Sequence, residues 1–253
     1  MALLATDAIV LHAFDYLESS RIIRLLTREA GVQSVLARGA RKSRGRYGSA
    51  LDLFAEGAAQ LYVKPNRELH NLAAFEIEKT RSALAEDLGR FTAASAVAEL
   101  ALRFAGEDAG PHLFDTVASV LDTLVASPPN RTIEDGLAAC WRIVAVLGFT
   151  PELGSCALCH TPIRDADEAM FSHASGGVIC AACCRLSPGG RNLPADARAA
   201  IRSWLDEEPT PSLSDNASRS HQRLLREFLV QHLADDRPLR AFGVWEHERW
   251  SAA

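Results

Sequence analysis

The chain has 253 residues, which is enough for one large domain or two smaller ones with buried cores of their own. Hydrophobic residues make up 48% and charged residues 23%, a composition that excludes a disordered or low-complexity chain. The formal net charge of −5 excludes a histone-like polycation, yet residues 1–80 hold 11 Lys and Arg against 9 Asp and Glu, whereas residues 81–253 hold 16 against 23. Any nucleic-acid surface is therefore expected to be local and to lie in the first third.

The amino-terminal residues lack the basic and apolar segments of a signal peptide, and no apolar run reaches the roughly 20 residues needed to cross a bilayer. We therefore expect a cytoplasmic protein with no membrane partner. Six cysteines in a reducing compartment are not expected to form a disulfide framework. Four of them fall into two close pairs, which is typical of a metal site.

Short apolar segments separated by turns follow one another between residues 6 and 79. Alternation of apolar and polar residues with a period of two predicts strands with one buried face. Five such strands in so short a stretch predict a small closed or partly closed antiparallel barrel, because curling buries the edges of so small a sheet. An alternative is a helix from Ser19 to Ala30, where the apolar residues also fit a helical period. The predicted strands are residues 8–11, 21–27, 32–37, 58–63 and 69–77.

Beyond residue 80 the chain is rich in Ala and Leu at helical spacing. Two long helices are expected before a Pro-Pro pair, and a third is expected to open at Thr132, with Asp135 completing a capping sequence, and to end at Gly148. Helical spacing returns in residues 194–205 and 221–233. The predicted fold class is α+β with more than one domain: a five-stranded barrel in residues 1–79 and a helical domain in residues 80–253, with a cysteine-rich insertion at about 154–190.

Two Cys-x-x-Cys pairs, Cys156-Ala-Leu-Cys159 and Cys180-Ala-Ala-Cys183, stand twenty residues apart in this insertion. Two such pairs can place four thiolates at tetrahedral corners about 2.3 Å from Zn²⁺, and this spacing lies at the long end of the usual range. Four protein ligands leave no open position for water, so we expect a structural zinc ion. The alternatives are chance pairs of buried cysteines and a redox pair, which the sequence context of neither pair favours.

Three further side chains lie close to these pairs in sequence. Cys184 adjoins the second pair and can replace Cys183 in a shifted register, and His160 and His173 are reserve ligands. Cys140 lies among apolar residues of a predicted helix and is expected to be a small core residue instead.

A basic segment without carboxylates follows the third predicted strand. Interspersed glycines predict a flexible loop, in which guanidinium groups can bind phosphates irrespective of base sequence. Tyr47 and Phe54 can stack on bases, although we expect both in the core. The alternative for the whole segment is a solvated basic loop without a partner. The candidate DNA-binding residues, including one on the second strand and two in a second turn, are Arg38, Arg41, Lys42, Arg44, Arg46, Arg24, Lys64 and Arg67.

No catalytic motif is found in the sequence. It lacks a Gly-Lys-Ser/Thr phosphate loop, a Gly-x-Ser-x-Gly elbow, a His-Glu-x-x-His motif and the paired motifs of a zinc deaminase. We therefore expect a binding protein rather than an enzyme.

Several short motifs occur in a particular order along the chain. In the amino-terminal third they are Thr6–Leu11, Asp15-Tyr16, Leu25–Glu29 with Gly31, Ala37–Arg41, Leu53-Phe54 and Gln60–Tyr62. Farther on they are Leu147–Leu153 leading into Cys156 and Cys159, then Phe171-Ser172, Gly176–Cys180 and Pro238–Arg240. Together they resemble the family of the bacterial DNA repair and recombination mediator RecO, and the resemblance covers most of the chain.

This resemblance implies an OB-fold barrel at the amino end and a helical domain that carries a zinc-finger-like element. It also implies binding of single- and double-stranded DNA, annealing of complementary strands and, together with RecR, loading of RecA onto single strands coated with SSB, in the bacterial cytoplasm at the nucleoid. Arg38 and Arg41 lie on a matched motif, whereas Lys42, Arg44 and Arg46 continue it by charge alone. By analogy with the family, an apolar groove with an arginine rim on the helical domain would bind the acidic tail of SSB.

This chain departs from some relatives in its few lysines and its acidic carboxyl half, which leaves DNA contact by the helical domain open. The competing hypothesis is a zinc-ribbon accessory factor of transcription or translation, in which the cysteines support protein or RNA contact and the barrel binds RNA. An enzyme is the third hypothesis. Preference for single-stranded DNA over structured RNA separates the first two.

Overall fold

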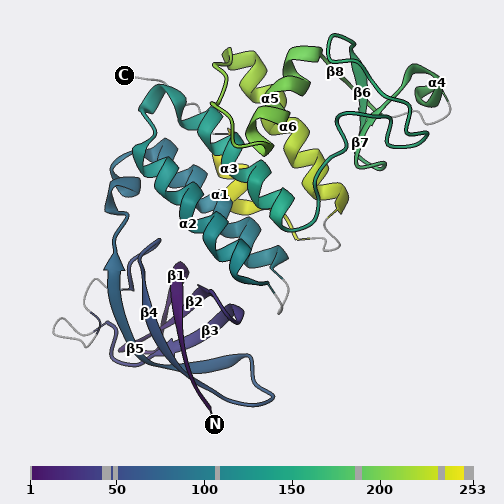
Figure 1. Ribbon diagram of the computed structural model, residues 1–253. Helices are drawn as coiled ribbons and strands as arrows, with labels where there is room; N and C mark the ends of the chain where they lie inside the picture. The colour runs from purple at the N-terminus through teal and green to yellow at the C-terminus, as the bar shows by residue number, and fades with distance from the viewer. Residues whose placement is uncertain are drawn as a thin grey trace. The chain divides into compact units, whose positions relative to one another are not determined.

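The structure is a computed structural model that describes residues 2–41, 47, 51–105, 109–185, 190–232 and 237–247. It divides into two compact units, Met1–Ser127 and Pro128–Ala253, which are described in turn (Figure 1). This division keeps the first two long helices with the strands, whereas the boundary near residue 79 stays a prediction. Among the described residues, no helix combines the length and the apolar character needed to span a bilayer.

The first unit opens with a closed five-stranded barrel, as the resemblance to an OB fold implied (Figure 1). Its strand order is β1-β2-β3-β5-β4, and all pairs are antiparallel except β3 with β5. The helix considered for residues 19–30 is wrong, because this segment forms β2 and a turn. The strands are β1 (Ala2–Tyr16), β2 (Ser20–Thr27), β3 (Gly31–Ala37), β4 (Glu56–Val63) and β5 (Leu69–Lys79).

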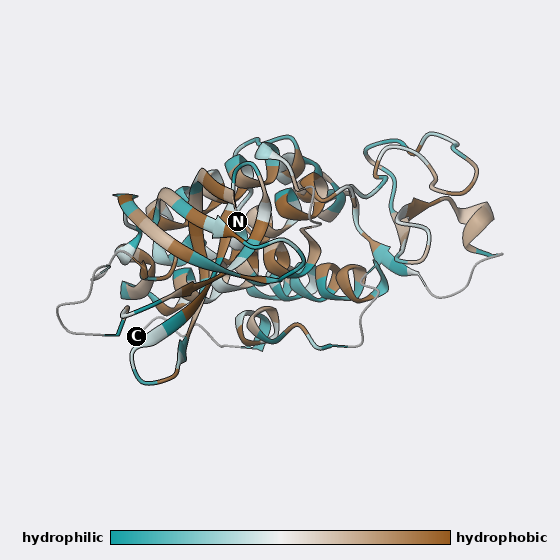
Figure 2. Ribbon diagram, turned by 90° about the horizontal axis from the view of Figure 1, so that it is seen from below, coloured by the Kyte–Doolittle hydropathy of each residue, from teal (hydrophilic) through white to brown (hydrophobic). Residues whose placement is uncertain are grey.

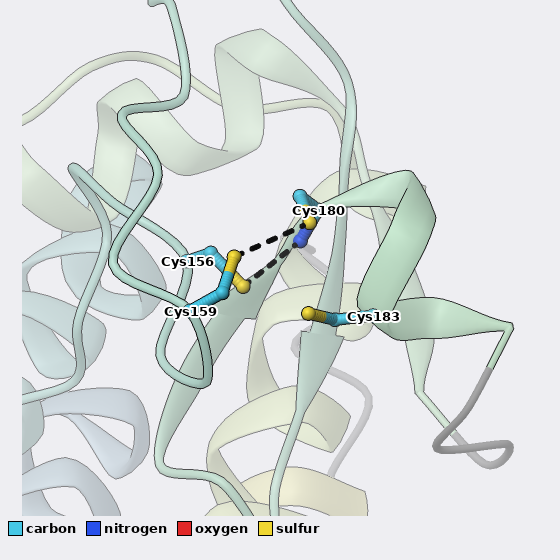
Figure 3. A group of neighbouring side chains, drawn as sticks. All are labelled: Cys156, Cys159, Cys180 and Cys183. Carbon is cyan, nitrogen blue, oxygen red and sulfur yellow. Dashed lines mark hydrogen bonds between the residues drawn. The ribbon is translucent and has the colours of Figure 1, made fainter.

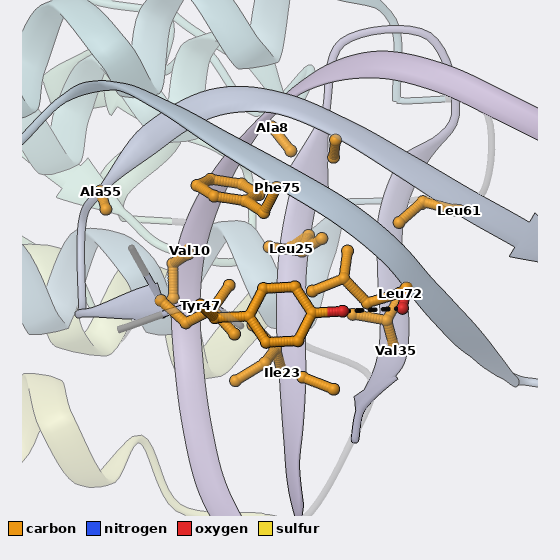
Figure 4. Close-up of a cluster of buried hydrophobic side chains, with 13 residues drawn as sticks. Ala8, Val10, Ile23, Leu25, Val35, Tyr47, Ala55, Leu61, Leu72 and Phe75 are labelled. Carbon is orange, nitrogen blue, oxygen red and sulfur yellow. Dashed lines mark hydrogen bonds between the residues drawn. The ribbon is translucent and has the colours of Figure 1, made fainter. Parts of the chain in front are cut away.

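The barrel encloses a core of small and branched apolar side chains (Figure 4). Figure 2 shows the matching alternation of apolar and polar residues along the strands. Tyr47 is buried in this core, where its hydroxyl donates to the Leu72 carbonyl oxygen at 3.0 Å. Phe54 is also buried and meets Phe91 edge-on, with 6.1 Å between ring centroids. Both rings are core residues, as expected, so neither is available to stack on bases.

β1 is the longest strand and carries a bulge near its middle. Val10 pairs with Leu25 but His12 pairs with Arg24, so Leu11 is an extra residue without a partner on β2. Side chains alternate between the two faces of a strand, so one extra residue moves the side chains that follow it to the opposite faces. Val10 therefore points into the barrel core, whereas His12 and the residues that alternate with it lie on the outer face.

Two helices of the first unit, α1 (Leu88–Phe104) and α2 (Pro111–Ala126), follow a short η2 turn (Ser82–Glu86). Arg81, just before this turn, is 3% exposed and links the barrel to α2. Its guanidinium bonds Glu56 Oε2 at 2.6 Å, Asp122 Oδ1 at 2.7 Å and the Phe54 carbonyl oxygen at 3.0 Å. Burial alone would raise the pKa of Asp122, but hydrogen bonds from Arg81 and Lys79 outweigh it and hold that pKa below its usual value.

Replacing Arg81 by Met would leave two carboxylates without their buried cation, so we expect a loss of roughly 3 kcal/mol in the free energy of unfolding. Lys79→Met is the matched control, because Lys79 bonds the same Asp122 carboxylate at 2.7 Å from a half-exposed position. The Lys79→Met variant should lose no more than about 1 kcal/mol in the free energy of unfolding. Urea unfolding followed by circular dichroism measures both, and equal losses would contradict the role given to Arg81.

The second unit packs helices around three fully buried tryptophans, Trp141, Trp204 and Trp245. The predicted cap at Thr132 is wrong: its hydroxyl donates back to the carbonyl oxygens of the preceding Pro-Pro pair, and Arg131 is the residue before the helix. The last long helix begins six residues earlier than predicted, and the final short helix was not predicted. The elements are η3 (Pro129–Arg131), α3 (Thr132–Val146), α5 (Ala195–Leu205), α6 (Asp215–His232) and α7 (Arg240–His247).

The cysteine-rich insertion contains more regular structure than its composition indicates. Three short strands form a sheet in the order β7-β6-β8, and one turn of helix follows β7. The strands have only three or four residues each, so their hydrogen bonds alone give little stability. These elements are β6 (Ala169–Ser172), β7 (Gly177–Ile179), α4 (Ala181–Cys184) and β8 (Arg191–Leu193).

His221 on α6 makes the second unit sensitive to acid. Its ring is 3% exposed and meets Trp204 edge-on, with 4.9 Å between ring centroids, and burial lowers its pKa to about 4. The unfolded chain therefore binds this proton at a higher pH than the folded chain, so the stabilising contribution is complete above pH ~6.5 and is lost toward pH 4.

His221→Phe keeps the ring contact but removes the proton, so we expect the variant to lose stability less steeply than the wild type between pH 6.5 and 5. The full difference corresponds to about 3 kcal/mol over the whole interval between the two pKa values. Urea unfolding of both proteins at a series of pH values checks this. Parallel pH profiles would show that His221 does not carry the effect.

Candidate metal centre and nucleic-acid interface

The two Cys-x-x-Cys pairs meet in space (Figure 3). Cys156 and Cys159 lie in the loop beyond α3, whereas Cys180 and Cys183 flank the start of α4. The four Sγ atoms all lie within 4.8 Å of one another. This group can hold a metal ion.

The separation of the sulfurs fits tetrahedral coordination. Thiolates at about 2.3 Å from a tetrahedral metal ion stand about 3.8 Å apart. The Sγ atoms of Cys159 and Cys180 are 3.7 Å apart, without a disulfide bond between them. The four residues therefore suit one metal ion, and a fourth thiolate leaves no coordination position for water.

The surrounding backbone stabilises thiolates in this group. Burial raises the pKa of Cys156, but the backbone amides of Cys159, Cys180 and Leu158 outweigh it and lower that pKa to about 6. The Thr161 hydroxyl, 3.3 Å from Cys159 Sγ, lowers the pKa of Cys159. The neighbouring sulfurs raise the pKa of Cys183 to about 12, since a further negative charge among them is unfavourable. A bound cation would remove this conflict and release the remaining protons.

Short contacts fix the loops that carry the cysteines. The Cys156 amide donates to the Thr161 carbonyl oxygen at 2.9 Å, and the Ala157 amide donates to Val178 at 2.8 Å. At Gly177 a Cβ atom would lie 2.3 Å from the Glu152 carbonyl oxygen, so only glycine fits beside this strand. Neither Thr161 nor Gly177 was predicted as part of the site, although the glycines before Cys180 are a signal of close backbone approach.

The reserve ligands do not belong to this sulfur group. Cys184, His160 and His173 lie outside the four-residue group found among the described residues. His173 instead contacts Glu227, with 3.1 Å between Nε2 and Oε2, and burial lowers its pKa. Cys140 is completely buried, as expected of a core residue, and burial raises the pKa of its thiol.

Cys156→Ser should release the metal ion and destabilise the second unit, because the remaining thiolates would repel one another without a cation. Cys184→Ser is the matched control, since it removes an adjacent thiol outside the group. Elemental analysis should find one ion per chain in the wild type and the control, and far less in Cys156→Ser. Unchanged metal content and unchanged thermal unfolding in Cys156→Ser would contradict this role.

The basic segment begins at the end of β3. Arg38 is exposed and has no ion-pair partner among the described residues. The Arg41 guanidinium bonds the Leu17 carbonyl oxygen at 3.0 Å and Asp15 at 3.3 Å, so it also holds the β1–β2 hairpin. The same carboxylate accepts from Arg21 at 3.2 Å, which leaves a net positive group at this end of the barrel. Lys42, Arg44 and Arg46 lie outside the described residues.

The other three candidates lie elsewhere on the first unit. Arg24 is half-buried on β2 and donates to the Leu102 carbonyl oxygen at 3.3 Å. Lys64 and Arg67 lie in the β4–β5 turn. β3 and β5 run parallel with Ser34 beside Leu69, so this turn precedes the strand pair whereas Arg38 follows it. Arg38 and Arg67 therefore lie beyond opposite ends of this strand pair, and they form two basic groups rather than one.

Comparison with known proteins assigns both parts of the chain to one family. The family model described as "Recombination protein O N terminal" matches residues 1–81, and that described as "Recombination protein O C terminal" matches residues 85–241. The chain belongs to the recombination protein O family. The DNA repair protein RecO of Anaeromyxobacter sp. (strain K) is 34% identical over 244 residues, which cover 92% of this chain and 93% of that protein. The DNA repair protein RecO of Gloeobacter violaceus (strain ATCC 29082 / PCC 7421) is 35% identical over 232 residues, covering 90% and 87%.

Proposed function

We propose that this chain is a recombination mediator that binds single- and double-stranded DNA, anneals complementary strands and, with RecR, helps to load RecA onto SSB-coated single strands. Membership of the recombination protein O family gives the chain a role in DNA repair and recombination. The observation that carries the proposal is the closed OB-fold barrel with an exposed, basic end, in a chain that matches both family models.

DNA binding rests on the arginines that follow β3. Arg38 offers an exposed guanidinium, and the Arg41 and Arg21 guanidinium groups share the single carboxylate of Asp15. Phosphates can replace this carboxylate and neutralise the excess charge, and the counterions they release favour binding. Lys42, Arg44 and Arg46 would extend this surface, and Arg24, Lys64 and Arg67 would contact DNA away from it. No bond is made or broken in this role, since two strands held on one protein anneal through their raised local concentration.

The metal ion in the proposed function is a structural Zn²⁺. Four thiolates form a donor set typical of zinc, and they complete its tetrahedral shell. The ion would join the loop of Cys156 to the start of α4 and so stabilise a sheet whose strands are very short. Cys159, Cys180 and Cys183 would be its other ligands.

The tail of SSB, RecR and RecA are the protein partners of the proposed function, the last of them an indirect one. A groove of about 460 Å³ between the start of α5 and α6 has the character that an acidic, apolar tail requires. Leu193, Pro194 and Leu224 are its apolar lining residues, and Arg191, which is paired with Glu227, adds a guanidinium to the lining. Asp196 opposes an acidic peptide there, so the tail would enter from the side of Arg191.

Arg38→Glu should slow annealing of two complementary fluorescent oligonucleotides, because it reverses a charge on the proposed phosphate path. Arg219→Glu makes the same change at an exposed position of α6 and should anneal like the wild type. Annealing by the wild type should need no nucleotide and should weaken steeply as salt increases. Structured RNA serves as competitor, and stronger binding of RNA than of single-stranded DNA would favour the competing RNA-binding hypothesis.

A further inference from the structure

A row of aromatic side chains lies exposed on the outer face of β1, beyond the bulge. His12, Phe14 and Tyr16 alternate along the strand, and the two larger rings are 44% and 40% exposed. The His12 and Phe14 ring centroids are 5.8 Å apart and their planes are tilted by 57°, so the two rings do not cover each other's faces. Exposed rings grouped in this way mark interaction sites more often than isolated apolar residues do.

The bulge at Leu11 is what places these rings outside the barrel. Ala8 and Val10 belong to the barrel core, so a regular strand would direct the even-numbered residues that follow into the same core. After the extra residue it is Ala13 that packs against the core, and the rings point outward. The bulge thus leaves Phe14 and Tyr16 exposed instead of buried. Bulges that redirect side chains occur preferentially beside functional sites.

The row of rings ends at the basic group. Tyr16 pairs with Ser20 at the β1–β2 hairpin, and the backbone amide of Arg41 donates to the neighbouring Ser19 carbonyl oxygen at 3.2 Å. Leu17 at the hairpin tip is 74% exposed, and its φ of 53° lies in the left-handed region that a leucine rarely adopts. The Arg41 guanidinium holds this strained residue through its carbonyl oxygen. Asp15, which binds Arg21 and Arg41, alternates with the rings and faces the other side of β1. Ala37 pairs with Arg21, so Arg38 follows at the level of Ser20 and Tyr16 and continues the row of rings.

We infer that Phe14 and Tyr16, with His12 beside them, bind unpaired bases by stacking, while Arg38 at the end of the row binds the phosphates of the same strand. This inference rests on the proposed function and adds a reason why the protein would prefer single-stranded to double-stranded DNA. In a duplex the base faces are already stacked on one another, so none is open to an aromatic ring. Every base has a face on which a ring can stack, so the preference for single strands should not depend on base sequence.

The test compares three ligands of equal length: a poly(dT) strand, a strand with the same phosphates but abasic sugars, and a duplex. The wild type should bind poly(dT) more tightly than the abasic strand. Phe14→Ala and Tyr16→Ala should each lose about tenfold in affinity for poly(dT), with little change for the abasic strand. Tyr16→Phe keeps the ring and should bind like the wild type.

Tyr62→Ala is the matched control. Tyr62 is 43% exposed on the outer face of the same barrel, but it pairs with Leu3 near the start of β1, far along the strand from Tyr16. The Tyr62→Ala variant should leave the difference in affinity between poly(dT) and the abasic strand unchanged. Because all of these side chains are exposed, thermal unfolding should be similar in every variant.

Four results would overturn the inference. If the wild type binds poly(dT) and the abasic strand equally, or if Tyr16→Ala weakens both alike, the rings do not bind bases although the barrel binds DNA, and the proposed function stands. If Tyr16→Phe loses as much affinity as Tyr16→Ala, the hydroxyl rather than the ring makes the contact. If the wild type binds no DNA at all, the proposed function fails and the inference fails with it.

Discussion

The first unit depends on a short parallel pairing that closes its sheet. Ser34, Val35 and Leu36 on β3 pair with the first three residues of β5, and this contact joins the two strands that would otherwise be open edges. A parallel pair cannot be joined by a tight turn, so the chain must return through β4 before β5 begins. Arg41, at the start of the segment that leaves β3, meets the β1–β2 hairpin at Ser19 and Leu17.

The second unit has a different constraint, because its cysteine-rich insertion is too small to form a hydrophobic core of its own. Three strands of three or four residues cannot hold a sheet without further cross-links. The thiolate group supplies such a link between segments more than twenty residues apart in the chain. Backbone amides around Cys156 and the hydroxyl of Thr161 already favour thiolates there, so the protein moiety is prepared for a cation before one binds.

Features that follow from a local sequence pattern were predictable. Features that depend on how one segment of the chain contacts another segment were not. The five strands of the barrel, the main helices and the cysteine group follow from spacing alone. The bulge at Leu11 depends on how β1 pairs with β2, which no alternation within β1 reveals. Thr132 was misassigned as a cap because it is itself the first residue of α3, where its hydroxyl donates to the carbonyl oxygens of the preceding prolines instead of accepting from a helix amide. The short α7 is defined by two buried rings, Phe242 and Trp245, rather than by a long period.

The distribution of tryptophan gives the two units separate optical signatures. All four tryptophans of the sequence lie beyond residue 127, and Trp141, Trp204 and Trp245 are fully buried in the second unit. Selective excitation of indole therefore reports on the second unit alone, whereas far-ultraviolet circular dichroism reports on the strands of the barrel as well. If the two signals change at different denaturant concentrations, the units unfold independently and the chain has no single free energy of unfolding. Coincident transitions would mean that the whole chain unfolds in one cooperative step.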